Sequence, residues 1–358
     1  MSALWSDHIA GLVPYVPGEQ ARIPNLLKLN TNENPYGPSP KALAAMQAAI
    51  SDALRLYPDY QALGLRRAVA RRFRLEPDQV FLGNGSDEIL AHVFNAFFRR
   101  GERALWLPDV TYSFYRTYCR FYDVPHRLIP LADDFTLRIG DYTGDTDQEP
   151  AGIIFANPNA PTGCALDLGS IAAIAQARRD CAVVIDEAYV DFGAESAASL
   201  LGRYPNLVVV HTLSKSRSLA GLRVGYALAS TELINGLLRV KDSFNSYPLD
   251  QVALAGAQAA IEDEAWFEQT CQAVVQSREK LSTELQALGF SVLPSSTNFV
   301  FARHRSQDAV VIARRLRDHG ILVRHFQAPR INDYLRITVG TPEQCQRLCD
   351  TLKGILSD

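Results

Sequence analysis

A lysine and an arginine eight residues apart suggest chemistry on a carbonyl compound that carries a phosphate. Lys215 follows Ser214, and both come after the apolar run at residues 207–210. A lysine amine that traps a carbonyl must be held partly out of water so that it can lose its proton. Arg223 supplies a fixed planar cation suited to a phosphate. A lone lysine is more often a solvated surface cation, so this interpretation depends on partners elsewhere in the chain.

A glycine-rich turn at residues 83–88 follows a short apolar run and opens a helical pattern. Backbone amides and the positive end of a helix suit a phosphate, and Gly85 and Ser86 are the residues expected to hold it. Taken alone, a helix cap formed by Ser86 or Asp87 explains the motif equally well.

Two further loops follow predicted strands at residues 104–107 and 152–155. The first contains Tyr112, an aromatic ring that could stack on a planar heterocycle. The second begins with Asn157, whose side-chain amide can donate to a phenolate oxygen. The plainer alternatives are a packed aromatic ring and a polar loop tip.

Asp186 directly follows the buried run at residues 182–185. A buried anion needs a cation, and a pyridinium nitrogen would satisfy that need while keeping the ring able to accept electrons. Tyr189 would then reach the ring oxygen beside Asn157, whereas a helix cap by Asp186 is the structural alternative. The four loops together predict a site for a phosphorylated, cationic, aromatic aldehyde.

The elements that must position these residues form an alternating pattern. Between about residues 60 and 230, short apolar runs alternate with helical patterns, which predicts a mainly parallel sheet covered by helices on both faces. Ligands of such sheets bind at the carboxyl ends of the strands. Pro248 is expected to open one long helix that stops at Gly289.

The rest of the chain predicts a smaller α+β unit, joined by part of the N-terminal segment. We expect residues 1–50 to contribute to this smaller domain and to an active-site loop. Residues 51–248 would form the large cofactor-binding domain. Residues 249–358 would form the interdomain helix and the C-terminal small domain. The proline-rich segment at residues 29–38 should line a site, because long ordered loops often do.

Composition favours small-molecule chemistry. The chain has 358 residues, 47% of them hydrophobic, and a formal charge of −3, so no basic field for nucleic acid or for an acidic membrane surface is expected. No apolar stretch approaches the ~18 residues of a membrane span. The six cysteines contain no CxxC pair, so no metal site is expected. The N-terminus lacks a secretion-signal pattern, and we expect a cytoplasmic protein.

Two arginines interrupt apolar strands near the C-terminus, at Arg324 and Arg336. This placement is costly unless a bound anion or a carboxylate side chain compensates the charge. Both explanations stay open, and the neighbouring Arg330 could compete for an anion.

The ordered set of loop residues resembles the pyridoxal 5′-phosphate (PLP) enzymes of the aspartate aminotransferase fold, across nearly the whole chain. This resemblance implies an α/β structure of fold type I: a mainly parallel seven-stranded sheet flanked by helices, with a smaller α+β domain. Within that superfamily, several segments are most similar to the histidinol-phosphate aminotransferase family. They are residues 12–15 (LVPY), 29–35 (LNTNENP), 57–59 (YPD), 186–189 (DEAY) and 334–341 (YLRITVGT).

The resemblance implies a role for each matching residue around the cofactor ring. Lys215 would bond to the cofactor aldehyde and act as general acid and base, and Asp186 would pair with the pyridine nitrogen. Asn157 and Tyr189 would contact the ring hydroxyl, and Tyr112 would stack on the ring.

The resemblance also implies the anion contacts. Tyr57 of the partner subunit in a homodimer would reach the cofactor phosphate, which makes the sites composite. Arg336 matches the arginine that holds the substrate α-carboxylate, and Arg324 and Tyr15 match positions that bind the phosphate of histidinol phosphate. The residues of the same subunit that would hold the cofactor phosphate are Gly85, Ser86, Ser214 and Arg223.

The implied reaction exchanges an amino group between L-histidinol phosphate and 2-oxoglutarate, in a step of histidine biosynthesis that yields imidazole acetol phosphate and L-glutamate. The partners would be small amino and keto acids. Two alternatives share the cofactor contacts: an aminotransferase for aromatic amino acids and a PLP-dependent threonine-phosphate decarboxylase. A non-catalytic regulatory domain of a DNA-binding protein is disfavoured by the weakly acidic composition.

Overall fold

The computed structural model describes residues 4–15, 18–21 and 24–357. Its centre is a seven-stranded sheet in the order β2-β8-β7-β6-β5-β3-β4. Neighbouring strands run parallel, except that β8 is antiparallel to both β2 and β7. The predicted fold class is thereby confirmed. The strands are β2 (Val80–Asn84), β3 (Leu105–Pro108), β4 (His126–Ile129), β5 (Gly152–Ala156), β6 (Ala182–Asp186), β7 (Leu207–Thr212) and β8 (Val224–Ala229).

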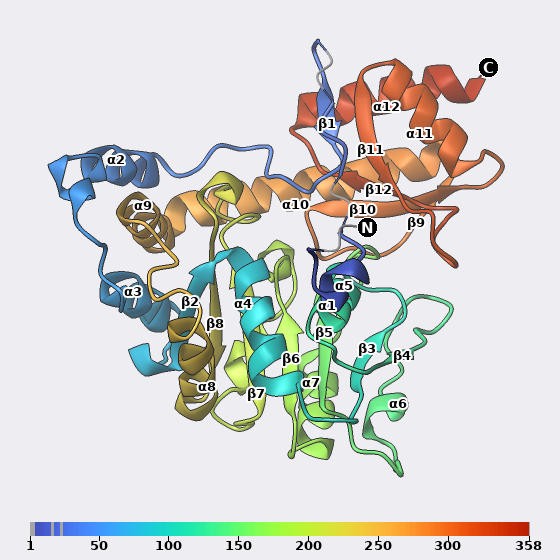
Figure 1. The fold of residues 1–358 in the computed structure, drawn as a ribbon. Coiled ribbons are helices and arrows are strands. Elements are labelled where there is room, and N and C mark those ends of the chain that lie inside the picture. Colours follow the sequence, from blue (N-terminus) through green and yellow to red (C-terminus); the bar gives the residue numbers. More distant parts are fainter. Residues whose placement is uncertain (1–3, 16–17, 22–23, 358) are drawn as a thin grey trace.

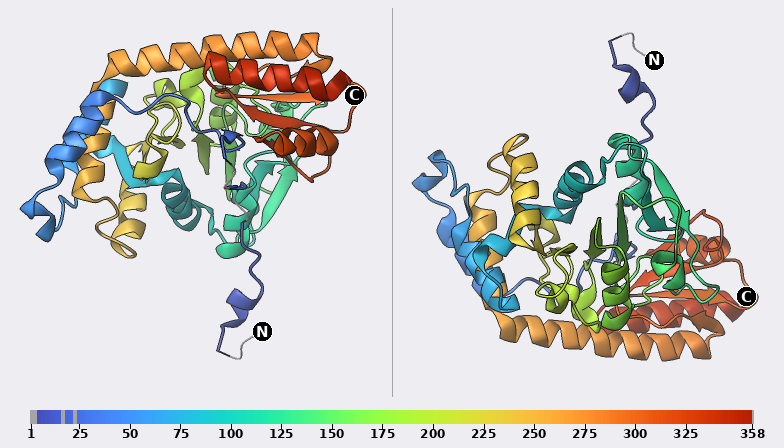
Figure 2. Two further views of the ribbon diagram at one scale, coloured as in Figure 1. Left: turned by 90° about the horizontal axis from the view of Figure 1, so that it is seen from above. Right: turned by 90° about the horizontal axis from the view of Figure 1, so that it is seen from below.

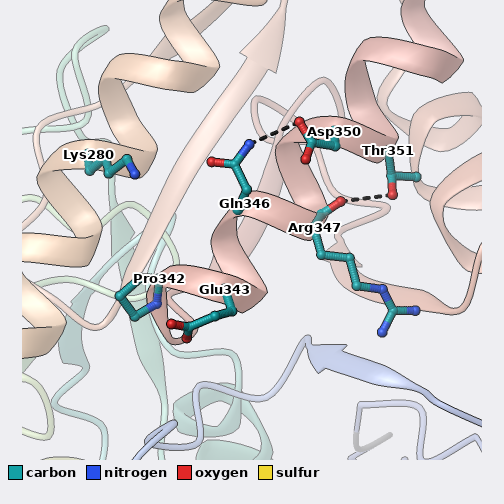
Figure 3. Close-up of a pocket in the computed structure, with 7 residues that line it drawn as sticks. All are labelled: Lys280, Pro342, Glu343, Gln346, Arg347, Asp350 and Thr351. Atoms are coloured by element: carbon teal, nitrogen blue, oxygen red, sulfur yellow. Dashed lines mark hydrogen bonds between the residues drawn. The ribbon is translucent and has the colours of Figure 1, made fainter.

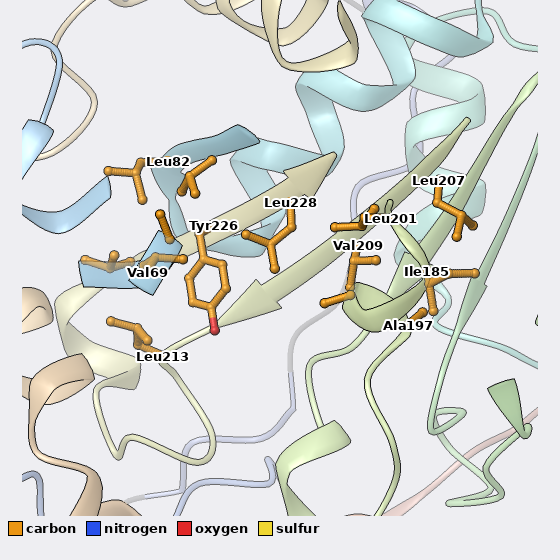
Figure 4. Close-up of a cluster of buried hydrophobic side chains, with 14 of the residues drawn as sticks. Val69, Leu82, Ile185, Ala197, Leu201, Leu207, Val209, Leu213, Tyr226 and Leu228 are labelled. Atoms are coloured by element: carbon orange, nitrogen blue, oxygen red, sulfur yellow. The ribbon is translucent and has the colours of Figure 1, made fainter. Parts of the chain in front are cut away.

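Helices cover both faces of this sheet (Figures 1 and 2). Side chains alternate between the faces, as expected for strands buried on both sides. Ile153 of β5 packs in one apolar cluster with Ile171, part of which is drawn in Figure 4, whereas Ile154 packs in another with Leu90. The helices of this layer are α3 (Leu63–Phe73), α4 (Gly85–Val93), α5 (Phe114–Phe121), α6 (Gly140–Thr143), α7 (Leu168–Ala177), α8 (Thr231–Asp242) and α9 (Gln251–Glu262).

A second sheet of five strands has the order β1-β11-β12-β10-β9. Strand β1 comes from the N-terminal segment and pairs in parallel with β11, Leu27 lying opposite Ile321. The division of the chain into domains that begin at residues 51 and 249 remains a prediction. The elements of this layer are β1 (Leu27–Leu29), β9 (Phe290–Val292), β10 (Phe299–His304), α11 (Ala309–Asp318), β11 (Ile321–His325), β12 (Leu335–Thr338) and α12 (Pro342–Ser357).

The helical segment after Pro248 is two helices, so the prediction of one long helix was wrong. Asp263 lies between α9 and α10 (Glu264–Ala287) with a non-helical φ of −92° and ψ of 70°. Its carboxylate accepts hydrogen bonds from Ser39 Oγ at 2.5 Å and Lys41 Nζ at 3.0 Å. These contacts with α2 (Pro40–Ala49) fix a bend, after which α10 runs beside both sheets (Figure 2).

The remaining elements are short. In the described part of the chain, no helix is long and apolar enough to cross a membrane, and no three His, Cys, Asp or Glu side chains are grouped as a metal site. The short helices are α1 (Asp7–Ala10), η1 (Asp52–Arg55), η2 (Pro77–Gln79), η3 (Phe94–Phe98), η4 (Val190–Phe192), η5 (Ala197–Leu200) and η6 (Ala220–Leu222).

Candidate active site

The predicted cofactor residues meet at one edge of the seven-stranded sheet. Strand register places Asn84, the last residue of β2, opposite Val224, the first residue of β8. Thr212 at the end of β7 lies opposite Gly225, and Asp186 at the end of β6 lies opposite Val210. The loops that leave these strand ends therefore share one edge, as the sequence predicts.

Two glycines shape the turn at the start of α4. Gly85 has a φ of +76°, and a Cβ atom there would lie 2.5 Å from Nη2 of Arg223. A Cβ atom on Gly225 would lie 2.7 Å from the backbone nitrogen of Ser86. A larger residue at either position would displace the Arg223 guanidinium or the start of α4. The two glycines therefore allow the guanidinium and the first backbone amides of the helix to lie close together. Amides at a helix start beside an arginine suit a phosphate.

Asp87 joins the start of α4 to Arg223 and Tyr112, a role that was not predicted from the sequence. Its carboxylate accepts from Arg223 Nη2 at 3.1 Å and from Tyr112 OH at 3.3 Å. Its backbone carbonyl accepts from Tyr118 OH at 2.6 Å. The helix-cap alternative for Ser86 or Asp87 is not observed, because Asn84 occupies the cap position and no side chain caps the helix.

Asp186 is a buried carboxylate that forms no ion pair with a lysine, arginine or histidine side chain among the described residues. It is 5% exposed, and its oxygens accept from Tyr115 OH at 2.8 Å and from the backbone nitrogen of Ala188 at 3.3 Å. Burial raises the pKa of Asp186 to about 6, although these hydrogen bonds act in the opposite direction. A positively charged ring nitrogen would lower that pKa again and compensate the buried charge. The helix-cap alternative is not observed, because Asp186 ends β6 and the next helical element, η4 (Val190–Phe192), has Tyr189 at its cap position.

The ring-hydroxyl candidates are oriented by neighbours. Asn157 is buried, and its side chain both donates to Leu166 O at 3.2 Å and accepts from Leu166 N at 2.7 Å. One amide hydrogen of Asn157 stays available to a ligand. Tyr189 OH accepts from Asn32 Nδ2 at 3.0 Å, and its ring meets Phe299 edge to face.

The proline-rich segment lines the site, as predicted. Lys215 is half-buried, and its Nζ donates to the backbone oxygen of Thr31 at 3.2 Å. The amide of Asn34 donates to Lys215 O at 2.9 Å. Among the described residues, no carboxylate oxygen lies within 4.0 Å of this Nζ. Contacts with Thr31 and Asn34 thus hold the lysine in place.

The two strand arginines lie side by side. Arg324 in β11 is opposite Arg336 in β12. Arg336 donates to Asn30 O at 3.0 Å, but its buried Nε has no hydrogen-bond partner in residues 4–15, 18–21 and 24–357. Burial lowers the pKa of Arg336, and the charge of Arg324 lowers it further. In the described part of the chain, neither guanidinium pairs with a carboxylate, so the salt-bridge alternative is not observed and a bound anion is the remaining compensation.

Aromatic rings surround this pair. The guanidinium carbon of Arg336 lies 5.4 Å from the rings of Phe299 and Phe326. Tyr15 packs on Phe114 with ring centroids 4.9 Å apart. The phenols of Tyr189, Tyr15 and Tyr112 all lie close enough to act on the pKa of Arg336. The arginines of one sheet therefore face the loops of the other.

Tyr57 does not join the site within one chain. It lies between η1 and α3, is 81% exposed and stacks on Tyr247 with ring centroids 4.8 Å apart. No hydrogen bond or ring contact joins it to another of the predicted site residues. Its role in the site of a neighbouring subunit stays a prediction.

A hollow between α10 and α12 contains none of the predicted site residues (Figure 3). Its side chains bond to one another, as when Gln346 donates to Asp350 at 3.0 Å. It is lined by Lys280, Pro342, Glu343, Gln346, Arg347, Asp350 and Thr351.

Comparison with known proteins agrees with this geometry. Residues 24–352 match the model of the family "Aminotransferase class I and II". The chain is 59% identical over 357 residues to histidinol-phosphate aminotransferase 1 of Bordetella parapertussis, covering 100% of both chains. It is 58% identical to histidinol-phosphate aminotransferase 1 of Pseudomonas aeruginosa, over 98% of this chain and 99% of the relative. The chain belongs to the histidinol-phosphate aminotransferase family.

A solved structure supports the fold of this aminotransferase. Histidinol-phosphate aminotransferase from Sinorhizobium meliloti, in complex with pyridoxal-5′-phosphate, superposes with a TM-score of 0.89. It is 24% identical and covers 100% of this chain and 98% of its own. The family confirms the predicted enzyme class, a PLP-dependent aminotransferase, and the predicted cofactor.

The donor set of this aminotransferase fits PLP. Three features lie along one sheet edge: a turn that a Cβ atom would fill, the buried carboxylate of Asp186 and the half-buried amine of Lys215. They match the phosphate, the ring nitrogen and the aldehyde of the cofactor. Which residue performs which role is part of the proposal that follows.

Proposed function

We propose that this aminotransferase exchanges the amino group between L-histidinol phosphate and 2-oxoglutarate, forming imidazole acetol phosphate and L-glutamate. The proposal rests on Arg324 and Arg336, which face the cofactor edge. Among the described residues, neither arginine pairs with a carboxylate. A phosphate dianion suits two guanidinium groups, each able to donate in a fork. Histidinol phosphate has no carboxylate, so its phosphate is the group that the couple would bind.

The geometry supports a set of contacts to the cofactor. Asp186 would hold the pyridine nitrogen, with Tyr115 fixing the carboxylate. Asn157 and Tyr189 would bind the ring hydroxyl, and Tyr112 would lie against the ring. The residues that would hold the phosphate are Gly85, Ser86, Ser214 and Arg223, joined by Tyr57 of the partner subunit.

Bound PLP supplies an electron-poor ring that stabilises negative charge on the substrate carbon bearing the amino group. The protein has to hold that carbon beside a base. Lys215 Nζ, tethered at Thr31, would take the proton from this carbon and return a proton to the neighbouring cofactor carbon. The Asp186 carboxylate, kept dry by the sheet, would hold the ring nitrogen protonated throughout.

Both half-reactions would use one anion site. Arg336 would bind the α-carboxylate of glutamate or 2-oxoglutarate and share the phosphate of histidinol phosphate. Arg324 and Tyr15 would serve the phosphate. Removing Arg324 should therefore harm the phosphorylated substrate more than an amino acid without a phosphate.

A homodimer in the cytoplasm completes the proposal. Tyr57 stacks on Tyr247, and large apolar side chains in the same two chain segments are open to solvent, including Ile50 (64%), Leu56 (54%) and Phe244 (77%). Such a patch is typical of an interface, and a second copy would bring its own Tyr57 there. All six cysteines are unpaired, which suits a reducing compartment.

A substrate panel tests the function. We expect Arg324→Gln to lower kcat/KM for histidinol phosphate, because a charge-assisted phosphate contact is lost. The decrease should correspond to roughly 2 to 4 kcal/mol of lost transition-state stabilisation. Phenylalanine turnover should change far less. The matched control is Arg314→Gln on α11, an exposed arginine. Equal losses for both substrates would contradict the phosphate role of Arg324. Preferred turnover of phenylalanine would instead indicate an aromatic aminotransferase, and release of carbon dioxide from threonine phosphate would indicate a decarboxylase.

A further inference from the structure

The loop between the two arginine strands makes a charged contact with the other sheet. Residues 326–334 connect β11 to β12, and Arg330 lies near the middle. Its Nη1 donates to Asp109 Oδ2 at 2.7 Å, and its Nη2 donates to Leu131 O at 3.0 Å and Ala132 O at 2.8 Å. These contacts use three of the five N–H donors of the guanidinium and pair its charge with Asp109.

Asp109 is built to receive this arginine. It follows β3 directly, and its other oxygen, Oδ1, accepts from Val110 N and Leu131 N, both at 2.9 Å. The carboxylate thus ties two loops of the seven-stranded sheet before it meets Arg330. Three residues later in the same loop comes Tyr112, which faces the cofactor edge.

Apolar packing surrounds the charged contact and supports it. Tyr334 and Ile331 of the connecting loop pack in one buried cluster with Phe135 and Val110 of the opposite layer. The ring of Phe135 meets that of Tyr334 edge to face, with centroids 5.6 Å apart. The guanidinium carbon of Arg330 lies 5.4 Å from the same Phe135 ring.

Hydrogen bonds within the connecting loop make it rigid, so it can fix the positions of the two strands that it joins. The ring Nε2 of His325, the last residue of β11, lies 2.7 Å from Asn332 O, and Tyr334 N donates to Ile331 O at 3.2 Å. Arg330 itself adopts a φ of +69°, a conformation that non-glycine residues rarely take without surrounding support. Arg324 and Arg336 each stand six residues from Arg330, on the strands that this loop joins.

We propose that Arg330 and Asp109 are positioning residues, which set the separation between the substrate-binding arginines and the cofactor edge. This inference rests on the proposed roles of Arg324 and Arg336. The pair touches neither substrate nor cofactor. Its side chains are 31% and 21% exposed, so thermal unfolding of each variant has to accompany the kinetics, and the change in KM should appear in fully folded enzyme.

Two single variants and their double variant test the proposal on the holoenzyme. Arg330→Met keeps the length and removes the donors, and Asp109→Asn keeps an acceptor for Val110 N and Leu131 N while removing the charge. Each should raise KM roughly 10-fold for both histidinol phosphate and 2-oxoglutarate, with kcat within about threefold, because ground state and transition state lose the same binding. The double variant should be no worse than the worse single one.

Spectroscopy separates this role from a merely structural one. The affinity for PLP and the pH dependence of the visible absorbance of the lysine-linked cofactor should match wild type, since Arg330 contacts no cofactor residue. Arg330→Lys should restore part of the KM. The matched control is Arg303→Met: Arg303 lies 5.5 Å from the Tyr334 ring on the exposed side, and its removal should leave KM unchanged.

The outcomes distinguish the two proposals. If Arg330→Met leaves both KM values unchanged, or if the two single effects multiply in the double variant, the positioning role is wrong. If Arg336→Gln also leaves kcat/KM unchanged for both substrates, the proposed anion site itself fails. A loss with Arg336→Gln alone would overturn only the role of Arg330.

Discussion

The cofactor edge of the seven-stranded sheet and the anion site of the five-stranded sheet are prepared in opposite ways. At the cofactor edge, polar groups bond to one another: Asp87 binds Arg223 and Tyr112, and Tyr115 binds Asp186. Such bonds hold side chains in one geometry before any ligand arrives, which lowers the entropic cost of binding.

At the anion site, the arginines have few partners. Arg324 faces Arg336 across the strands, and a buried Nε of Arg336 bonds to nothing among the described residues. Two cations of like charge in a poorly hydrated place destabilise the ligand-free protein and strengthen the binding of an anion. The cofactor edge is thus held in one geometry by its own hydrogen bonds, whereas the charge of the two arginines is to be compensated by a bound anion.

The largest expected effect breaks the cofactor side. Lys215→Ala should lower turnover by roughly 10⁴-fold or more and abolish the visible absorbance of the lysine-linked cofactor, because both the covalent attachment and the proton transfer are lost. Absorbance and stopped-assay turnover measure this. Lys353→Ala, which removes an exposed lysine of α12, is the control.

Mixing subunits sharpens the same experiment. If sites are composite, dimers formed from inactive Lys215→Ala and Tyr57→Ala chains should regain roughly a quarter of wild-type activity, since half of the dimers carry one intact site. A mixture that stays inactive, with sedimentation showing exchanged dimers, would remove Tyr57 from the cofactor site.

Asp186→Asn should separate catalysis from stability. Turnover should fall roughly 10²-fold to 10⁴-fold, because the ring nitrogen loses its anion. The cofactor-free variant should nevertheless gain stability above pH 6. The folded pKa of about 6 lies above the ordinary 3.8, so the folded state keeps a proton that the unfolded state releases, and wild-type stability falls as pH rises through that window.

Thermal unfolding of the cofactor-free proteins measures this gain. We expect Asp186→Asn to exceed wild type by on the order of 2 kcal/mol at pH 8 and by about half as much at pH 5, because the wild-type loss builds up between about pH 4 and pH 6. Asp180→Asn, at an exposed position before β6, should follow wild type at both. Equal stability of Asp186→Asn and wild type at pH 8 would mean that the buried charge is compensated within the protein.

The smallest expected effect compares the two arginine environments directly. In ligand-free protein, Arg324→Gln should be neutral or stabilising by about 0.5 kcal/mol, because a like-charge contact is relieved. Arg223→Gln should destabilise by up to about 1 kcal/mol, since the partly exposed pair with Asp87 is lost. Chemical unfolding of both variants measures the difference, and the reverse order would contradict the contrast between the regions.

The sequence predicted the cofactor edge because each strand there is a plain apolar run that stops at a polar residue. Parallel strands bring such stops together, so Asn157, Asp186 and Lys215 could be placed on one edge without knowing the strand order. Strand β4 was missed because three of its four residues, His126 to Leu128, are exposed at the sheet edge and leave no apolar run.

Other features needed tertiary contacts that no local pattern shows. Tyr115 stands in a run of aromatic residues, a context that suggests only core packing, and its hydrogen bond to Asp186 becomes visible only in the structure. The bend at Asp263 depends on Ser39, more than 200 residues away. Asp87 was read as a possible cap because it opens a helix, whereas its partners Arg223 and Tyr112 come from two other loops.

A single five-residue stretch, from Asn30 to Asn34, connects the two regions. Its backbone oxygens receive Lys215 and Arg336, and its Asn32 side chain meets Tyr189. One peptide-bond cut by a protease within this stretch would disturb the contacts of Lys215 and Arg336 at once, so resistance to proteolysis there would report on whether both side chains keep their positions.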